Sequence, residues 1–216
     1  MSRAIAIDGP AASGKSSVAK LLSKRLNLVM VNSGSMYRAV AWRVLQLGID
    51  YTDVEALDAA SLVSPLQCGV DETGLLSTVG YDDIILTDGE LRTNEINAIV
   101  SSISGHPLIR EFLLEKQRDY LQHSDVVMEG RDIGTVIFPD TPYKFFFKAS
   151  EAVRQKRRDA EGVTDSVAKR DQQDSNRKVA PLKPASDAFI IDTGDHSIEG
   201  VASIIESHLK ETLNWA

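Results

Sequence analysis

Short runs of apolar residues alternate with longer amphipathic stretches along most of the chain. Ala4–Ile7 is apolar throughout, which is typical of a strand buried on both faces. In 15–26, apolar side chains recur every three or four residues and predict an amphipathic helix. Further strands are predicted at 28–31, 126–128, 144–147 and 189–191, and further helices at 36–47, 53–63 (capped by Asp53), 93–104, 107–122 and 201–209. Strands that alternate with helices predict an α/β fold, with a five-stranded parallel sheet covered by helices on both faces.

The pattern changes between Leu66 and Leu91, where short strand-like pieces are separated by turn residues. Breaks at 72–74 and at 88–89 favour small antiparallel hairpins over another strand–helix–strand unit. We therefore expect one domain over 1–216 that carries a small inserted β lobe at 64–92.

Charge and cysteine content narrow the classes of function. The net charge of −7 argues against a protein that binds long nucleic acids by bulk electrostatics, but it leaves room for a local basic pocket. Cys68 is the single cysteine, so neither an intrachain disulfide nor a cysteine-based metal cluster is expected. No apolar run is long enough for a signal peptide or a membrane span. We expect a cytoplasmic, monomeric protein without membrane or long nucleic acid partners.

A phosphate-binding motif follows the first predicted strand. The run Gly9-Pro10-Ala11-Ala12-Ser13-Gly14-Lys15-Ser16 matches G-x-x-x-x-G-K-[ST] in full, with a strand before it and a helix after it. Glycines let successive backbone N–H groups point at one anion, and the helix N-terminus adds favourable partial charge. We assign this run, with Ser17, to ATP, Lys15 to its β- and γ-phosphates and the Ser16 hydroxyl to Mg²⁺. The motif alone is shared by motors, switches and kinases, although the chain lacks an Asn-Lys-x-Asp guanine signature.

Arginines recur beyond the predicted strands, on the side of the sheet that faces the phosphate motif. They are Arg38, Arg131, Arg154, Arg157, Arg158, Arg170 and Arg177. Any one of them alone is more often a solvated surface residue. In an acidic chain the whole set indicates a second anion site, because the guanidinium group forms bidentate bonds with phosphate. Met128-Glu129 resembles the apolar-then-acid end of a Walker B strand; a carboxylate that simply caps the strand is the alternative.

Several of these motifs together resemble the bacterial cytidylate (CMP) kinase family. The matching runs are Ile7–Ser16, Ser33-Gly34 with Met36-Tyr37-Arg38, Gly130–Val136 with Phe138-Pro139-Asp140, and Arg170-Asp171 with Asp174 and Asn176-Arg177. The match covers almost the whole chain, and the combination is specific whereas the phosphate motif alone is not. The resemblance implies transfer of the ATP γ-phosphoryl group to CMP or dCMP with Mg²⁺.

The resemblance also implies roles for individual residues in the acceptor site. Ser101, Arg110 and Asp132 would face the cytosine, and Arg170 and Asp174 the ribose. In that family the inserted lobe enlarges the monophosphate site.

Other residues match positions that hold phosphate in this family. The acceptor phosphate would be held by Arg38, Arg131 and Arg177, near Ser33. The segment 150–165 would close over ATP and would carry Arg154, Arg157 and Arg158. Among these residues, we expect the transferring group to be stabilised by Lys15, Arg131, Arg158 and Arg177.

Three positions depart from the family pattern. Asn32 stands where an aspartate is usual, Glu129 where aspartate is common, and Ser35 where alanine is usual. Asn32 lacks the carboxylate that could orient metal-bound water, so the catalytic rate or the metal preference is expected to differ from that of the family.

We therefore predict a Mg²⁺-dependent nucleoside monophosphate kinase that makes CDP from CMP. The rival interpretations are a P-loop kinase with another small acceptor and a nucleotide-dependent switch that does not catalyse transfer. The arginines favour transfer, because a switch needs no second anion site.

Overall fold

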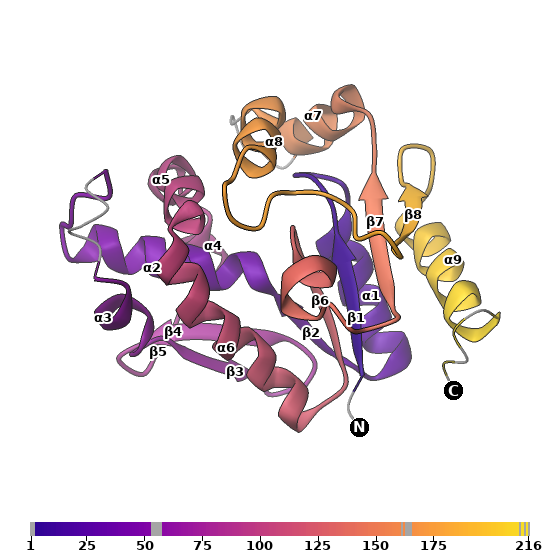
Figure 1. Ribbon diagram of the computed structural model, residues 1–216, viewed down its shortest axis with the longest axis horizontal. Helices are drawn as coiled ribbons and strands as arrows, with labels where there is room; N and C mark the ends of the chain where they lie inside the picture. Colours follow the sequence, from indigo (N-terminus) through magenta and orange to yellow (C-terminus); the bar gives the residue numbers. More distant parts are fainter. Residues whose placement is uncertain are drawn as a thin grey trace.

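The computed structural model describes residues 3–52, 58–160, 162, 166–211, 213 and 215. Its centre is a five-stranded parallel sheet in the order β2-β6-β1-β7-β8 (Figure 1). The strands are β1 (Ala4–Asp8), β2 (Val29–Asn32), β6 (Val126–Gly130), β7 (Lys144–Lys148) and β8 (Phe189–Asp192). The predicted parallel sheet is confirmed, with small shifts at the strand ends.

Helices cover both faces of this sheet, as predicted. The helices of the described residues are α1 (Lys15–Leu26), α2 (Ser33–Gln46), α3 (Ala59–Val63), α4 (Asp88–Leu91), α5 (Asn94–Gly105), α6 (Pro107–His123), α7 (Glu151–Ala160), α8 (Val167–Ser175) and α9 (Ile198–Glu211). A short π-helical turn, η1 (Ile133–Ile137), follows β6. Over the described ranges, no helix has the length and apolar character needed to cross a bilayer.

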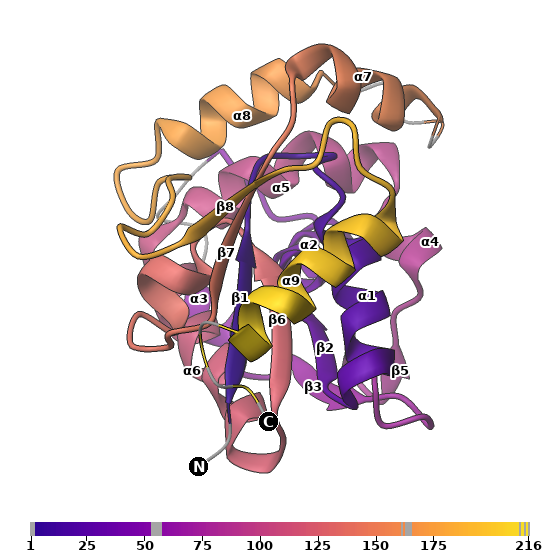
Figure 2. The same cartoon turned by 90° about the vertical axis from the view of Figure 1, so that its right-hand side faces the viewer.

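Alternate side chains of the central strand enter two separate apolar cores. Ile5 and Ile7 pack among side chains of α1 and α9 on one face, where Figure 2 shows these two helices. Ala4 and Ala6 face the other way, toward the core built with α2, α5 and α6. This two-residue alternation on a strand that is buried along its whole length explains why its sequence is apolar without interruption.

Two sequence predictions between the second strand and the fifth helix need correction. Helix α3 begins at Ala59 rather than at 53, because the Asp58 carboxylate accepts from the amides of Ala60 (3.1 Å) and Ser61 (3.3 Å) and caps it there. The predicted cap, Asp53, lies outside the described residues. The Asp88-Gly89 break is the start of α4, since Thr87 and Glu90 form a reciprocal capping box that nucleates a helical turn.

The inserted lobe contains a separate antiparallel sheet, as predicted. Its strands are β3 (Gln67–Val70), β4 (Ser77–Tyr81) and β5 (Ile84–Ile85), in that order. The Tyr120 hydroxyl on α6 donates to the Gly69 carbonyl (3.0 Å), and the Tyr81 hydroxyl donates to the Leu62 carbonyl on α3 (2.7 Å). These bonds tie the lobe to the helices beside it.

Two helices lie across the carboxyl ends of the parallel strands. Figure 1 shows α7 and α8 above the tip of β7, on the side from which the β1–α1 loop also projects. Because ligands of open parallel sheets bind beyond the carboxyl ends of their strands, this is the side on which a site is expected.

Candidate active site

The loop between β1 and α1 approaches neighbouring backbone closely. A Cβ atom at Gly9 would lie 2.7 Å from the carbonyl oxygen of Phe147 on β7, so only glycine fits there. Gly14 has φ of 89°, a left-handed conformation that glycine adopts without strain, and α1 starts at the next residue. The loop therefore ends at a helix N-terminus, which has the geometry of an anion site.

Lys15, the first residue of α1, is buried inside this loop. Its Nζ donates to the Pro10 carbonyl (2.7 Å) and to Ser13 Oγ (3.4 Å). Burial, helped by the positive charge of Arg131, lowers the pKa of Lys15 to about 7. A phosphate beside this ammonium would stabilise its charged form, so the loop is built to gain from an anion.

The next residue meets the end of β6. The Ser16 hydroxyl donates to Oε1 of Glu129 at 2.7 Å. Mg²⁺ prefers hard oxygen ligands and keeps several waters when it binds together with phosphates. Within the described residues there is no group of three or more His, Cys, Asp or Glu placed to hold a metal alone. A hydroxyl beside a carboxylate therefore fits an ion that arrives with the nucleotide rather than one held in a protein cage.

A cleft of about 310 Å³ runs from this loop to the arginine-rich side of the sheet. Most of the residues predicted for the site line it: Ala11, Ala12, Ser13, Gly14, Lys15, Ser16, Ser17, Ser33, Arg38, Ser101, Arg110, Arg131, Asp132, Arg158, Arg170, Asp174 and Arg177. The predicted residues outside this lining are Gly9, Pro10, Arg154 and Arg157. Of the predicted lobe 64–92, Arg92 alone among the described residues reaches the lining.

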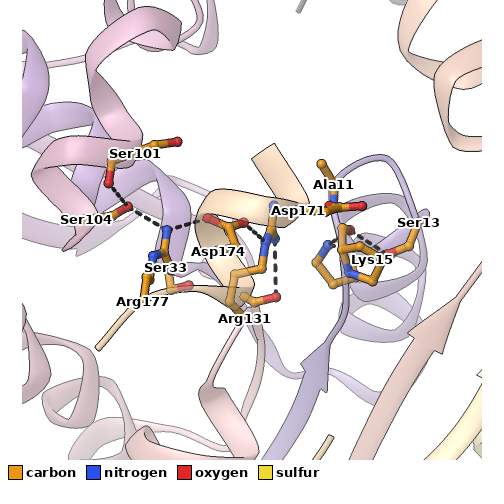
Figure 3. A network of polar contacts seen from close by, with 12 residues as sticks. Ala11, Ser13, Lys15, Ser33, Ser101, Ser104, Arg131, Asp171, Asp174 and Arg177 are labelled. Carbon is orange, nitrogen blue, oxygen red and sulfur yellow. Dashed lines mark hydrogen bonds and ion pairs between the residues drawn. The ribbon is translucent and has the colours of Figure 1, made fainter. Parts of the chain in front are cut away.

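Asp174, on α8, joins two arginines at the centre of the cleft. Its Oδ2 accepts from Arg131 Nε (2.7 Å), and its Oδ1 accepts from Arg177 Nη2 (2.5 Å). Arg177 also donates to Ser104 Oγ on α5 (2.7 Å), and Figure 3 shows this chain of contacts. Burial alone would raise the pKa of Asp174, but the charges of Arg131 and Arg177 hold it below its ordinary value.

A second ion pair, Arg110 with Asp132, is buried at the far end of the cleft. Arg110 Nη2 donates to Asp132 Oδ2, and its Nη1 donates to the Ser104 carbonyl (2.9 Å). The guanidinium carbon lies 5.4 Å from the centre of the Tyr37 ring. Burial raises the pKa of Asp132 against the opposing charge of Arg110. An acceptor and a donor are thus held in fixed relation in the cleft, which Ser101 also lines.

Ser33 and Arg38 on α2 are held by hydrogen bonds to neighbouring elements. The Ser33 hydroxyl donates to the Glu129 carbonyl (2.8 Å). Arg38 Nη1 donates to the Leu91 carbonyl and to Asn97 Oδ1, both at 2.9 Å. Arg38 therefore connects α2 to α4 and α5 while it lines the cleft.

Arg154 and Arg157 support the phosphate loop from behind. Arg154 Nη1 donates to the Ala11 carbonyl (3.2 Å) and to Asp171 on α8, whose Oδ1 accepts from the Ala11 amide (3.3 Å). Arg157 Nη2 donates to the Thr193 carbonyl (2.6 Å), and the Thr193 hydroxyl donates to the Ser13 carbonyl in the loop (2.9 Å). These contacts tie α7 to the loop; Arg158, on the same helix, lines the cleft. Positions 161 and 163–165 of the predicted 150–165 segment lie outside the described residues.

Sequence reasoning missed the structural role of Asp8, the last residue of β1. Its two carboxylate oxygens accept from the amides of Ile133 and Gly134, each at 2.8 Å, and so hold η1 against the sheet. Burial raises the pKa of Asp8 to about 7 despite these two donors. An acid at the end of an otherwise apolar strand was the available signal, but its partners lie more than 120 residues away.

Comparison with known proteins identifies the family. The model of the cytidylate kinase family matches residues 5–211. The chain belongs to the cytidylate kinase family. A cytidylate kinase from Streptococcus suis is 41% identical over 97% of each chain, and one from Pseudomonas aeruginosa is 36% identical over 98% of this chain and 96% of its own.

Family membership confirms the predicted class, a nucleoside monophosphate kinase that uses ATP for phosphoryl transfer. A solved gluconokinase from Sinorhizobium meliloti shares the fold, with a TM-score of 0.50 at 16% identity over 98% of this chain and 95% of that one. The kinase fold predicted from the sequence is therefore confirmed as well.

Proposed function

We propose that this chain transfers the γ-phosphoryl group of ATP to CMP or dCMP, which yields ADP and CDP or dCDP. The observation that carries this proposal is a single cleft that joins the phosphate loop to Arg131, Arg177 and the Arg110–Asp132 pair. A nucleotide switch needs only the phosphate loop. A kinase needs the phosphate loop and an acceptor site, because donor and acceptor are anions that must meet in line.

On the donor side, the loop 9–14 and the start of α1 would bind the phosphates of ATP, with Ser17 and the rest of the first turn. Lys15 would exchange its bond to the Pro10 carbonyl for the β- and γ-phosphate oxygens. Ser16 and Glu129 are the residues that would hold Mg²⁺. When bound, Mg²⁺ neutralises charge on the phosphates and fixes their orientation. Arg158 would stabilise the transferring group from α7.

On the acceptor side, Arg131 and Arg177 would bind the phosphate of CMP, with Arg38 and Ser33 beside them. An oxygen of that phosphate forms a bond to the γ-phosphorus while the bond from the γ-phosphorus to ADP breaks. No covalent intermediate with the protein is needed, so positioning and charge stabilisation are the whole of catalysis. Arg170 and Asp174 would contact the ribose, and Asp174 would have to share the two arginines with the incoming phosphate.

The base would be selected by hydrogen bonds to Ser101, Arg110 and Asp132. Cytosine offers an amino donor at N4 and acceptors at N3 and O2. Arg110 can only donate, so it suits the N3 and O2 side, while ionised Asp132 can only accept and suits the amino group. Uracil has a donor at N3 and an acceptor at O4, the reverse of cytosine. It would leave two buried groups mispaired, at a cost of about 1–3 kcal/mol each.

The test is ADP release with a panel of monophosphates: CMP, dCMP, UMP, AMP and GMP. We expect turnover with CMP and dCMP and at least roughly a tenfold lower kcat/KM for UMP, which needs only about 1.4 kcal/mol. Turnover with AMP or GMP but not CMP would favour a kinase with another acceptor. ATP binding without ADP release for any of the panel would favour a switch.

The assembly state is part of this proposal: we propose a monomer, because one chain already supplies a phosphate loop and the arginines of an acceptor site to the same cleft. Light scattering at working concentrations is the measurement that checks it.

A further inference from the structure

Gln117, on α6, is a polar side chain in apolar surroundings. It is 1% exposed, and it belongs to the buried stripe of its helix together with Ile109, Leu113 and Tyr120. Over the described residues, neither its Oε1 nor its Nε2 has a hydrogen bond of ordinary geometry. Thr135 also has a buried hydroxyl of this kind, but Thr135 itself is only half-buried.

An unpaired amide in an apolar core opposes folding, because its donor and its acceptor leave water and gain no partner in return. Methionine has the same length as glutamine and would fill the same space without that penalty. Packing alone therefore does not explain an amide at position 117. Residues that break a local rule of stability are expected where function requires them, so the explanation is to be sought in what this amide touches.

The Tyr37 hydroxyl, from α2, lies beside the Gln117 amide. Burial raises the pKa of Tyr37, and the positive charge of Arg110 and the amide of Gln117 oppose that rise. Tyr37 is a member of the apolar core built with α2, α5 and α6, and it also lines the cleft. The tyrosine therefore connects the buried amide with the acceptor side of the site.

Tyr37 forms part of the support of Arg110. The guanidinium carbon lies 5.4 Å from the centre of the Tyr37 ring, within the range of a cation–π contact. The same guanidinium donates to the Ser104 carbonyl at 2.9 Å and to Asp132. The carbonyl and the carboxylate hold Arg110 by directional bonds, whereas the ring supports it only while the ring itself is fixed.

We propose that Gln117 is a positioning residue for base recognition: its amide holds the Tyr37 ring against Arg110 through the phenol hydroxyl, so that Arg110 keeps the orientation that suits cytosine. The inference rests on the proposed function, because that function gives Arg110 the role of reading the base. Gln117 and Arg110 are seven residues apart on α6, about two turns, so one helix carries both the reader and the group that orients its support. Stability is given up at position 117, and selectivity between bases is gained.

The experiment compares Gln117→Met with Gln122→Met, the same change at an exposed position of the same helix. Gln117→Met should raise the unfolding temperature by about 2–4 °C, because it removes an unpaired buried amide. It should also lower the ratio of kcat/KM for CMP to kcat/KM for UMP by about threefold or more. The loss should appear mainly in the KM for CMP, with kcat and the KM for ATP little changed. Gln122→Met should alter neither the unfolding temperature nor the ratio.

Tyr37→Phe tests whether the effect passes through the hydroxyl. This variant keeps the ring and removes the group that Gln117 faces, so it should lower the preference for CMP to about the same extent as Gln117→Met. In the double variant the two losses should not add, because both break the same link. A full preference for CMP in Tyr37→Phe, or additive losses in the double variant, would overturn the inference. Tyr37→Phe alone decides the matter if Gln117→Met does not fold.

A purely structural Gln117 gives a different pattern. Gln117→Met would then shift the unfolding temperature, or lower kcat for every acceptor, while the ratio for CMP over UMP stays at the wild-type value, and the inference would be wrong. Failure of the proposed function appears in the wild type itself, as an absence of CMP phosphorylation. Calorimetry of CMP binding then still tests the inference, because Gln117→Met should weaken binding of CMP and leave binding of ATP unchanged, and equal CMP affinity in both proteins would overturn it.

Discussion

The donor and acceptor halves of the cleft are built in different ways. The donor half is one continuous stretch, 11–17, in which backbone groups and a single buried lysine border the cleft. The acceptor half takes its side chains from α2, α5, α6, α8 and the end of β6, and it is held by ion pairs such as Arg110–Asp132 and Arg131–Asp174.

This difference has consequences for mutation. A backbone-built site keeps its geometry when one side chain is removed, so a substitution there should change the reaction and spare the fold. A site assembled from buried charge pairs loses stability when one partner is removed, because the other charge is left unpaired. Donor variants should therefore show kinetic defects alone, and acceptor variants should show kinetic and stability defects together.

The largest effect is expected in the donor half. Lys15→Ala should lower kcat by about 10²-fold or more, or roughly 2.7 kcal/mol of transition-state stabilisation, because its charge meets the charge that develops on phosphate. Thermal unfolding should be close to that of the wild type. Lys20→Ala, an exposed lysine of the same helix, is the control. Near-normal turnover by a folded Lys15→Ala protein would remove this residue from the mechanism.

In the acceptor half, Asp174→Asn should cost about 2 kcal/mol of unfolding free energy at neutral pH and raise the KM for CMP. The pKa of Asp174 is held below its ordinary value, so its stabilisation is present above the unfolded pKa and is lost as the pH falls through the folded one. The variant should accordingly lose less stability than the wild type on acidification below about pH 4.

Chemical denaturation across that pH range measures both effects. Asp82→Asn, which breaks an exposed arginine pair with Arg43, is the matched control and should cost about 0–1 kcal/mol. Equal stability of Asp174→Asn and wild type would contradict the proposed contrast between the two halves.

A smaller effect is expected on base selection. Asp132→Asn should erode most of the roughly tenfold preference for CMP over UMP, because an amide can rotate to donate to O4 of uracil. The measurement is kcat/KM for both acceptors, and the exposed Asp140 provides a control as Asp140→Asn. Equal use of CMP and UMP by the wild type would show that Ser101, Arg110 and Asp132 are assigned wrongly.

The smallest effect is expected in the segments around the cleft. CMP with a non-hydrolysable ATP analogue should slow hydrogen exchange in 154–162 and in 66–91, as both close and exclude water. Arg154 and Arg157 already tie α7 to neighbouring backbone, and the strands of the lobe contribute no residue to the lining, so changes of severalfold rather than orders of magnitude are expected. Unchanged exchange in both segments would count against closure.

Much of the fold was predictable from local pattern. The buried strands are apolar and the helices carry an apolar stripe along one face. The parallel sheet and the helical layers that cover it therefore followed from the periodicity of apolar residues. The helix start near Asp58 and the turn of helix at 88–91 were missed for a local reason. Several acids, serines and threonines there are possible caps, and the competition between them is decided by small energies.

The donor half could be predicted from the sequence alone, because the groups proposed to bind phosphate are adjacent along the chain and their geometry depends on local backbone conformation. The acceptor half could not be predicted in this way. Which carboxylate pairs with which arginine, and that Asn32 and Glu129 are partners on neighbouring strands, depend on the order of strands in the sheet. Charges act through space, and residues distant in sequence become neighbours only when the sheet and its helices have packed.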